Sequence, residues 1–341
     1  MVTLRRFACL LVGLFALLAA WSGSAGAADP AYHVLKKIKV GGDGGWDYVT
    51  FDPEARRLYI SRATRVQVLD VDKGEIVGEV PNTPGIHGIA LVPKLGRGFT
   101  SNGQDATATI FDLQTLKELD RVKVGMRPDA ILYDPSSGRV FTFNAGSKDA
   151  TAIDAESGKV AGTFKLGGKP ESAVADEQGQ IYVNLEDKDE IIAFDAKELT
   201  EKGRWPVAPG KEPVGLSMDR KNRRLFCSCH NEKMVVMDAD SGKVIATPPI
   251  GKGTDYCVFD PGTNLAFSSN GDGTLTVVQE EPAGEYRVVA SVKTEVGART
   301  MALDQKNHRI YLVTAKFKPA QAGQRRRTIE PDSFVVLEVG K

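Results

Sequence analysis

Short runs of alternating apolar and polar residues, separated by polar turns, fill the chain from about residue 32 to its end. The stretch Pro128–Gly168 shows the unit in full. Its turns contain Asp, Ser, Pro and Gly, which reverse the chain because Gly tolerates positive φ and Pro fixes φ. Its four β-rich runs are Ala130–Tyr133, Val140–Phe143, Thr151–Asp154 and Val160–Leu166. Four antiparallel strands in about 40 residues are typical of one β-propeller blade.

Two independent markers repeat with one period along the chain. An aromatic residue opens the second run of each unit, at spacings of 40 to 44 residues: Tyr59, Phe99, Phe141, Tyr182, Phe226, Phe267 and Tyr311. An aspartate closes the third run, at spacings of 41 to 43: Asp70, Asp112, Asp154, Asp195 and Asp238. One such sheet cannot bury both faces, so copies must stack, and a ring leaves no bare end. The pattern predicts an all-β, seven-bladed β-propeller, four antiparallel strands per blade, as a single domain over residues 28–341.

The two ends of the chain are predicted to share one blade. The seventh unit ends with Phe334–Val339, which supplies only a third strand. The missing fourth strand is available at the start as Tyr32–Val40, whose end resembles the fourth-strand endings of other units. We therefore expect the N-terminal strand to complete the last blade and close the ring.

Several second strands carry a recognisable signature. Phe99-Thr100-Ser101-Asn102, Phe141-Thr142-Phe143-Asn144 and Phe267-Ser268-Ser269-Asn270 resemble the Tyr-Val-Thr-Asn motif of the YVTN β-propeller repeat family, a WD40-like repeat. The Asp-Pro-x-x-x-Arg and Asp-x-x-Ser-Gly-Lys turns fit the same family. The resemblance covers about residues 32–341 and is greatest to YncE-like periplasmic proteins. It implies a propeller but no single activity, because such propellers serve as binding modules, scaffolds and enzyme domains.

Residues 1–27 resemble a cleaved secretory signal peptide. Arg5 and Arg6 form a basic start, Ala8–Ala20 an apolar core and Ala25-Gly26-Ala27 a cleavage site. The apolar core is short for a membrane span, although a retained anchor is the alternative, and no other stretch is apolar enough to span. We expect a monomeric mature chain without a transmembrane span, in the periplasm or, as the alternative, secreted.

The charge balance argues against general binding to polyanions. Lys plus Arg and Asp plus Glu each total 44, and loss of Arg5 and Arg6 would leave a slight acidic excess. One insertion in the seventh unit, residues 316–331, is basic: Lys316, Lys318, Arg325, Arg326 and Arg327 face one acid, Glu330. It is either a solvated loop or a lid that contacts a ligand or partner, and it alone supports single-stranded nucleic-acid binding.

A polar ring follows from aligning the seven units on the turn after their first strand. Five residues before that turn stand Asp47, His87, Asp129, Glu171, Val214, Asp255 and Arg299. The residues two positions further along in each unit are all apolar or sulfur-bearing, so the polarity is specific to the ring positions. The symmetry of a propeller would bring these side chains together at one mouth of the central channel. Trp46, Tyr48 and Tyr256 flank the ring, where they would stack on a ligand or pack between blades.

Several chemistries suit such a ring. Carboxylates and an imidazole can hold a cationic ligand or a divalent cation, for which Asp47, His87, Asp129, Glu171 and Asp255 are the candidate ligands. Arg299 can fix an anionic group. The competing interpretation is a water-filled channel mouth in which polar residues pair with one another.

A second set of polar residues ends the second strands. Arg62, Asn102, Asn144, His230 and Asn270 would line the same face as ligand contacts, or would only satisfy loop backbone groups. Cys227, Cys229 and Cys257 allow three interpretations: buried thiols, one disulfide between blades, or a copper or zinc site with His230. Their odd number leaves at least one thiol free or paired between chains.

The sequence contains no nucleophile elbow, phosphate-binding glycine loop or H-E-x-x-H motif. We therefore expect a non-catalytic scaffold that binds a small molecule, peptide or protein at the channel mouth, with no firm cofactor. The alternative is a metal-dependent hydrolase of the lactonase kind, with His87 as base or ligand and a divalent cation activating water.

Overall fold

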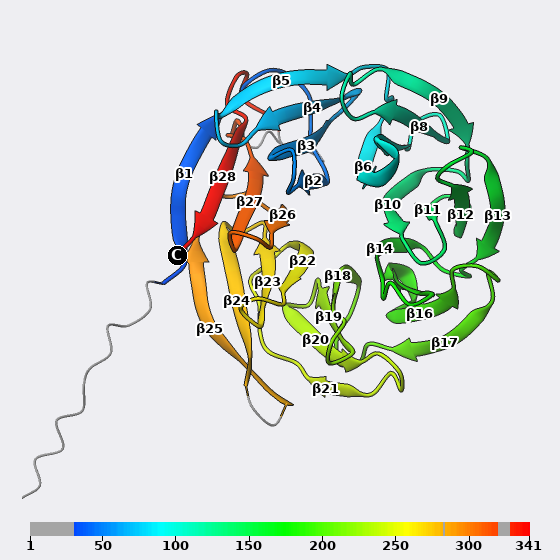
Figure 1. Cartoon of the computed structure of the whole chain (residues 1–341). Coiled ribbons are helices and arrows are strands. Elements are labelled where there is room, and N and C mark those ends of the chain that lie inside the picture. Colours follow the sequence, from blue (N-terminus) through cyan, green and yellow to red (C-terminus); the bar gives the residue numbers. More distant parts are fainter. Residues whose placement is uncertain (1–30, 282–283, 320–327) are drawn as a thin grey trace, which may run out of the picture. The chain divides into compact units, whose positions relative to one another are not determined.

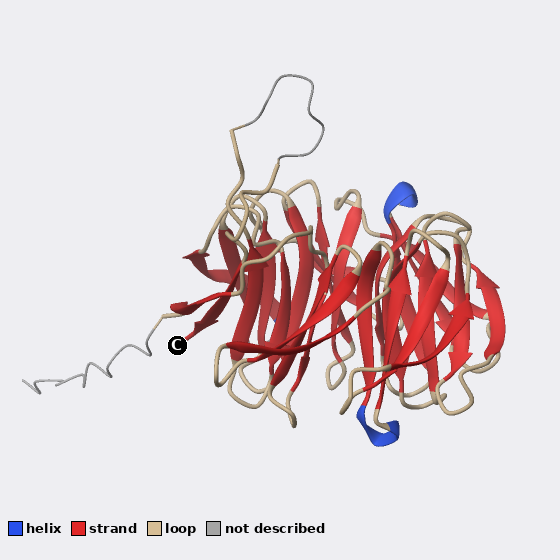
Figure 2. Cartoon of the chain, turned by 90° about the horizontal axis from the view of Figure 1, so that it is seen from above, coloured by secondary structure: helices blue, strands red, loops and turns tan. Residues whose placement is uncertain are grey.

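The computed structural model describes residues 31–281, 284–319 and 328–341 and confirms the seven-bladed propeller. Seven four-stranded antiparallel sheets surround a central axis (Figure 1). The signal-peptide prediction for residues 1–27 falls outside the described residues. The ring seen from its side is built of strands and loops, with two short 3₁₀ helices, Pro93–Leu95 and Glu186–Lys188, in the described part (Figure 2).

Each blade runs outward from the axis in chain order. Blade one comprises β2(Val49–Asp52), β3(Arg57–Arg62), β4(Arg65–Asp70) and β5(Glu75–Val80). Blade two comprises β6(Ile86–Val92), β7(Arg97–Asn102), β8(Thr107–Asp112) and β9(Glu118–Lys123). Blade three comprises β10(Pro128–Asp134), β11(Arg139–Asn144), β12(Asp149–Asp154) and β13(Val160–Lys165). Blade four comprises β14(Pro170–Ala175), β15(Gln180–Leu185), β16(Glu190–Asp195) and β17(Glu201–Pro206).

The remaining blades follow the same order. Blade five comprises β18(Pro213–Asp219), β19(Arg224–Cys229), β20(Lys233–Asp238) and the short β21(Val244–Ala246). Blade six comprises β22(Thr254–Asp260), β23(Leu265–Asn270), β24(Thr274–Glu281) and β25(Glu285–Lys293). Blade seven takes β26(Thr300–Asp304), β27(Arg309–Thr314) and β28(Val335–Gly340) from the end of the chain.

The ring closes as the sequence predicts. β1(His33–Lys39) pairs antiparallel with β28 and forms the outer strand of blade seven, with Ile38 opposite Val336. Ile38 is buried in the same apolar cluster as Phe334 and residues of blade one. The first and last strands of the described propeller are therefore held in one sheet.

The core lies between neighbouring blades rather than within any one of them. The second and third strands are almost wholly buried because a blade covers each of their faces, whereas the outer strands are mostly exposed. Phe141 of blade three, for example, meets Phe194 of blade four edge to face, with ring centroids 5.8 Å apart. The periodic aromatic of the sequence is thus the residue that fills the space between blades.

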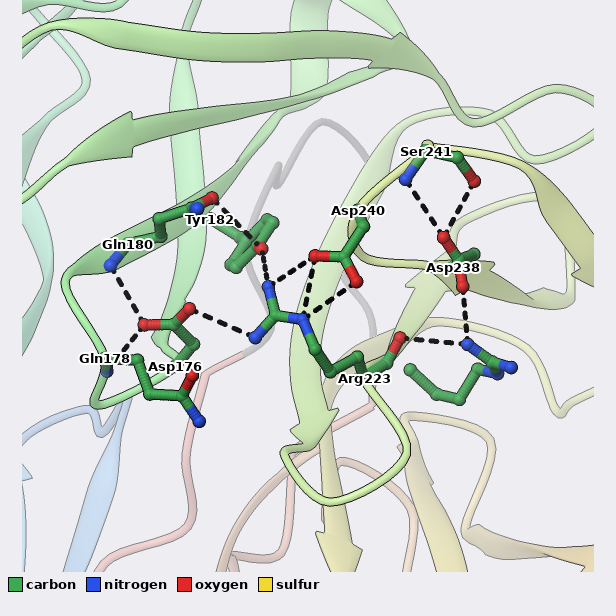
Figure 3. Close-up of polar contacts among 9 residues, drawn as sticks. Asp176, Gln178, Gln180, Tyr182, Arg223, Asp238, Asp240 and Ser241 are labelled. Atoms are coloured by element: carbon green, nitrogen blue, oxygen red, sulfur yellow. Dashed lines mark hydrogen bonds and ion pairs between the residues drawn. The ribbon is translucent and has the colours of Figure 1, made fainter.

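Polar clamps join the blades on the face where the first strands end. Arg57, Arg97 and Arg139 each begin a second strand and donate Nη1 to a carbonyl of the next blade: Leu113, Ala155 and Ala196. Between blades four and five, Arg223 takes over this role (Figure 3). Its Nη1 lies 3.2 Å from Asp176 Oδ2, and its Nη2 lies 2.7 Å from Asp240 Oδ1. Nη2 also donates to the Tyr182 hydroxyl at 2.9 Å.

Candidate functional site

The ring residues lie on the face opposite these clamps. His87, Asp129, Glu171 and Asp255 are each the second residue of a first strand, and Asp47 and Arg299 lie just before β2 and β26. The first strands are the innermost strands of the blades and surround the axis (Figure 1). The register prediction therefore places all six charged residues around one end of the central channel, called here the mouth.

A histidine bridges two carboxylates on blades one to three. His87 Nδ1 lies 2.6 Å from Asp47 Oδ2 and 3.5 Å from Asp129 Oδ1. Burial opposes a charge on His87, but the hydrogen bond to Asp47 and the nearby carboxylates outweigh it and raise its pKa to about 9. The imidazole is therefore a cation at neutral pH, held between two acids.

Two further cations face acids elsewhere in the mouth. Lys169 Nζ lies 3.1 Å from Glu171 Oε2 and also forms a close ion pair with Glu186. Glu171 Oε2 is buried, and the Lys169 ammonium is the cation beside it. Arg299 Nε lies 3.4 Å from Asp255 Oδ2 across the boundary between blades six and seven. Neither contact is an ideal hydrogen bond.

Three of the mouth acids resist ionisation. Burial, with the charges of neighbouring acids, raises the pKa of Asp129 to about 6 and those of Glu171 and Asp255 to about 7. Nearby His87, Lys169 and Arg299 oppose these shifts without cancelling them. Burial is the larger cause of these raised pKa values, and repulsion between neighbouring carboxylates is the smaller one. These acids are therefore partly protonated near neutral pH, and a cation bound beside them would favour their ionised form.

Two tyrosines close the channel below the acids. Tyr48, from blade one, reaches across the axis, and its hydroxyl donates to the Glu171 carbonyl of blade four at 3.4 Å. Its ring meets Tyr256 of blade six edge to face, with centroids 5.5 Å apart. Beyond them the channel contains a cavity of about 40 Å³, lined by Val49, Ile89, Ile131 and Ala173 among others. Such a volume accommodates water but not a substrate, so a ligand would bind at the mouth.

One group of the mouth could hold a metal ion. Ligand atoms of Asp47, His87 and Asp129 lie within 4.8 Å of one another. Carboxylate and imidazole donors suit a divalent ion. Because His87 binds a proton tightly between the two acids, a metal ion would have to displace that proton to use Nδ1.

The repeated asparagines serve the blades themselves. Asn102, Asn144 and Asn270 are fully buried. The amide of Asn102 donates to the Thr107 and Thr109 hydroxyls at 3.0 and 2.9 Å, and the other two make equivalent bonds within their own sheets. The expectation that they contact a ligand is therefore not supported. Each side-chain amide uses both of its N–H groups in hydrogen bonds within its own blade.

The other predicted flanking residues also lie outside the mouth cluster. Trp46 packs against Phe317 and Phe334, with centroid distances of 5.8 and 5.2 Å, as expected of packing between blades. His230 lies in the turn after β19, where its Nδ1 is 3.4 Å from Glu212 Oε2. Of the three flanking aromatic residues, Tyr48 and Tyr256 form the floor of the mouth and Trp46 does not.

Arg62 is an unusual member of the second set. Its side chain is fully buried over the Phe334 ring, and Nη2 donates to the Gly41, Gly42 and Asp43 carbonyls. Burial lowers its pKa to about 10. Arg62 thus fastens the connection between β1 and blade one, rather than lining the mouth.

The cysteines are three buried thiols in the described structure. Cys227 Sγ and Cys229 Sγ lie 3.8 Å apart on one strand, and Cys257 Sγ donates to the Phe226 carbonyl at 3.0 Å. Burial raises the pKa of Cys257 to about 12 and also raises that of Cys227. Because metal ligation and nucleophilic attack need thiolates, the surroundings disfavour both uses, and neither a disulfide nor a metal cluster forms among these residues.

The basic insertion begins with a short described stem. Phe317 forms an isolated β-bridge with Ile329, and Lys318 N donates to the Thr328 carbonyl at 2.8 Å. Arg325, Arg326 and Arg327, on which the nucleic-acid alternative depended, lie outside the described residues.

Sequence reasoning missed two features of the mouth. Lys169 and Glu186 add a cation and an acid to the ring positions that the alignment identified. Lys169 had a visible signal. The triplet Lys169-Pro170-Glu171 repeats the basic-Pro-acid pattern of Arg127-Pro128-Asp129 at the start of β10. Glu186 had no such signal, because it lies in the 3₁₀ helix Glu186–Lys188 that follows β15, outside the aligned register.

Comparisons with known proteins confirm the fold and do not identify a family. No protein-family model and no curated protein sequence matches the chain. A solved chain of Kuenenia stuttgartiensis hydrazine synthase superposes with a TM-score of 0.71 at 15% identity, covering 80% of this chain and 94% of that one. A chain of a mitotic checkpoint complex gives 0.72 at 11% identity, covering 89% and 96%. The RRP9 WD40 repeats give 0.74 at 8% identity, covering 91% and 97%.

These similarities, all below 25% identity, establish the β-propeller fold. Among the described residues, none of the helices has the length and apolar character that crossing a membrane requires.

Proposed function

We propose that this protein is a non-catalytic propeller of the YVTN type that binds a positively charged ligand at the channel mouth. One observation carries the proposal: Asp129, Glu171 and Asp255 converge there with pKa values raised to between about 6 and 7. Acids that are hard to ionise in the empty site would ionise readily beside a bound cation, so binding is favoured by relief of their repulsion.

The surroundings support binding rather than passage through the channel. The side chains of Asp47, Asp129, Glu171 and Asp255 are between 17% and 24% exposed, so a ligand can reach them. Tyr48 and Tyr256 close the channel beneath. A rigid ring of blades holds these groups in place without a ligand, which lowers the entropic cost of binding.

A cation panel tests the proposal. Calcium, zinc, copper and n-butylammonium chlorides are added to the purified protein at pH 7.5, and the melting temperature and binding heat are measured. We expect at least one cation to bind, and to bind more weakly to an Asp129→Asn, Glu171→Gln double variant. The exposed acid Asp120, on β9, provides the matched control Asp120→Asn. If no cation binds, the proposal fails, and turnover lost on Asp129→Ala would contradict its non-catalytic part.

A second candidate function rests on Asp47, His87 and Asp129, whose ligand atoms lie within 4.8 Å of one another. Such a group would serve a metal-dependent hydrolase of the lactonase kind, in which a divalent ion lowers the pKa of bound water. Metal analysis of protein purified without chelators decides this point. A metal-free protein whose melting temperature ignores calcium, zinc and copper would remove the candidate.

We also propose that the protein is exported to the periplasm. Support comes from Arg5, Arg6, the apolar Ala8–Ala20 and the Ala25-Gly26-Ala27 site. N-terminal sequencing of the protein from a periplasmic extract should find a chain that begins at Ala28. An unprocessed chain in the cytoplasmic fraction would contradict export.

A further inference from the structure

We propose that the protein has a second binding site, a pocket between blades one and two that takes an organic acid, a carboxylate joined to a compact apolar body. This pocket is separate from the channel mouth and opposite to it in charge, and it goes beyond the cation-binding function proposed above. It is supported by its lining, by the fixed position of its two arginines, and by a comparison with blade four.

The pocket has a volume of about 460 Å³ and lies where the connector from β5 to β6 passes from blade one to blade two. Three segments line it: the turn into β4, that connector, and β9 (Figure 1). The lining residues are Thr64, Arg65, Pro81, Asn82, Pro84 and Arg121. All of them are exposed or half-buried, so a ligand can touch them. A volume of this size accommodates a small organic molecule.

The lining combines positive charge with apolar rings. Arg65 and Arg121 bring two guanidinium groups, and the Asn82 amide adds neutral donors. None of the described residues that line the pocket is acidic. The rings of Pro81 and Pro84 supply apolar surface. Because a guanidinium can bind a carboxylate through two parallel hydrogen bonds, the arginines suit the acid group of a ligand and the prolines suit its hydrocarbon body.

Backbone carbonyls hold both arginines at the pocket. Arg65 Nη2 donates to the Asp43 carbonyl at 3.2 Å, and Arg121 Nη2 donates to the Asn82 carbonyl at 2.6 Å. Their acid partners have side chains between 35% and 41% exposed: Glu79, Asp105 and Glu118. Such exposed ion pairs contribute little, because water screens them. A ligand carboxylate can therefore replace these acids while the carbonyls keep the arginines in place.

Blade four contains the equivalent of Arg121 but has an acid where blade one supplies the second arginine. Arg204 is the fourth residue of β17, as Arg121 is of β9. Arg204 also pairs with the acid three residues before it, Glu201, and donates Nη2 to a carbonyl of the preceding connector at 3.0 Å. The third strand of the preceding blade, however, begins with Asp149, whereas that of blade one begins with Arg65. The repeat alone therefore does not require the arginine pair, which belongs to the boundary between blades one and two.

Binding of sodium benzoate, phenylacetate and hexanoate to the purified protein, measured by calorimetry at pH 7.5, tests the proposal. We expect at least one of these acids to bind, and Arg121→Ala and Arg65→Gln each to weaken it by about tenfold or more. Arg204→Ala is the matched control, because it removes the same kinds of contact from another blade, and it should change binding by about threefold or less. If Arg121→Ala does not fold, Arg65→Gln decides the outcome.

Further small molecules separate the two parts of the ligand. Benzyl alcohol should not bind because it lacks the charge, and acetate should bind more weakly than benzoate because it lacks the apolar body. N-acetylphenylalanine that binds more tightly than the three acids indicates the C-terminal residue of a peptide as the source of the carboxylate, and equal or weaker binding indicates a free acid.

Three outcomes would overturn the proposal: none of the three acids binds, Arg204→Ala weakens binding as much as Arg121→Ala does, or inorganic phosphate binds as tightly as benzoate. The last of these would indicate an anion site without an apolar contact. Each would leave the cation-binding function of the mouth standing, because the cation panel tests that function separately.

Discussion

The first strands of most blades carry an acid at both ends, and the fold treats the two ends in opposite ways. Asp129 and Asp134 lie near the two ends of β10, five residues apart, and Glu171 and Asp176 lie near the two ends of β14 at the same spacing. At the end away from the mouth, Asp134 accepts hydrogen bonds from Ser136 and Ser137, and Asp176 from Gln178, Gln180 and Arg223. At the mouth, the acids meet other acids.

Burial alone does not explain this difference. Asp304, at the far end of β26, is fully buried, yet hydrogen bonds from Asn307 and Arg56 outweigh its burial and lower its pKa. Asp129 is more exposed, and its pKa is raised to about 6. Backbone amides and arginines satisfy one set of acids, and the other set is left partly unsatisfied. Burial raises the pKa at both positions, but only Asp304 has hydrogen bonds from Asn307 and Arg56 that outweigh it.

The largest expected effect is on stability, from opening the closure of the propeller, which holds all the first strands in place. Deleting residues 28–40 removes β1, the outer strand of blade seven, together with buried Ile38. It also cuts the link between β1 and residues 41–43, whose carbonyls Arg62 holds. We expect a strong fall in the melting temperature because blade seven loses its outer strand and blade one its attachment. An unchanged melting temperature would show that closure by β1 contributes nothing.

Removal of an acid from each end should then have opposite effects. Asp304→Asn breaks the buried contact with Arg56 and should destabilise the protein by about 2 kcal/mol or more. Asp129→Asn removes a charge that burial and Asp47 disfavour, so at pH 8 it should leave stability unchanged or raise it. Chemical denaturation of both variants measures the difference. Equal destabilisation by both would contradict the distinction between the two ends.

The pH dependence should show the mouth acids directly. Asp129, Glu171 and Asp255 have folded pKa values above the unfolded values near 4, so the folded state binds more protons in between. Their contribution to stability is therefore present below about pH 4 and is lost as pH rises toward about 7. His87, with a folded pKa of about 9, loses its contribution between about pH 6.5 and 9.

Thermal unfolding across pH 4.5–8.5 checks this expectation, and the slope should be smaller in the Glu171→Gln, Asp255→Asn variant. The acids with lowered pKa, such as Asp304, act in the opposite direction but at lower pH. A stability that rises across this range would contradict the assignment.

The smallest expected effect is at the asparagines. Asn102→Ala should cost about 1–2 kcal/mol because the Thr107 and Thr109 hydroxyls lose a buried partner. Cation binding at the mouth should be retained. A variant of unchanged stability with weakened binding would return Asn102 to the candidate site.

The sequence predicted the fold because its repeat is local. Every blade restates the same strand lengths and turns, so Asp47, His87, Asp129, Glu171, Asp255 and Arg299 could be aligned by counting. The fourth strand of the last blade was also readable, as Tyr32–Val40. Symmetry then converted one register into one location in space.

The remaining details of the site depend on distances across the ring, which repeats do not encode. Tyr48 meets Glu171 from the other side of the channel, and Glu186 meets Lys169 from a separate turn. For Asn102 the sequence left two roles open, a ligand contact or a bond to loop backbone, and the structure instead pairs it with the Thr107 and Thr109 hydroxyls of the neighbouring strand. A periodic polar residue marks either a surface or an internal hydrogen-bond network, and only the pairing of strands decides which.

Site-resolved titration of the carboxyl carbons by NMR compares the pKa values of the mouth acids with those of the acids at the opposite end of the first strands. In the free protein, Asp129 should titrate near about 6 and Glu171 and Asp255 near about 7, whereas Asp304 should titrate below its ordinary value. A saturating cation from the panel should lower the values of Glu171 and Asp255 and leave Asp304 unchanged. Ordinary values at all three mouth acids, insensitive to any added cation, would contradict a cation-binding mouth.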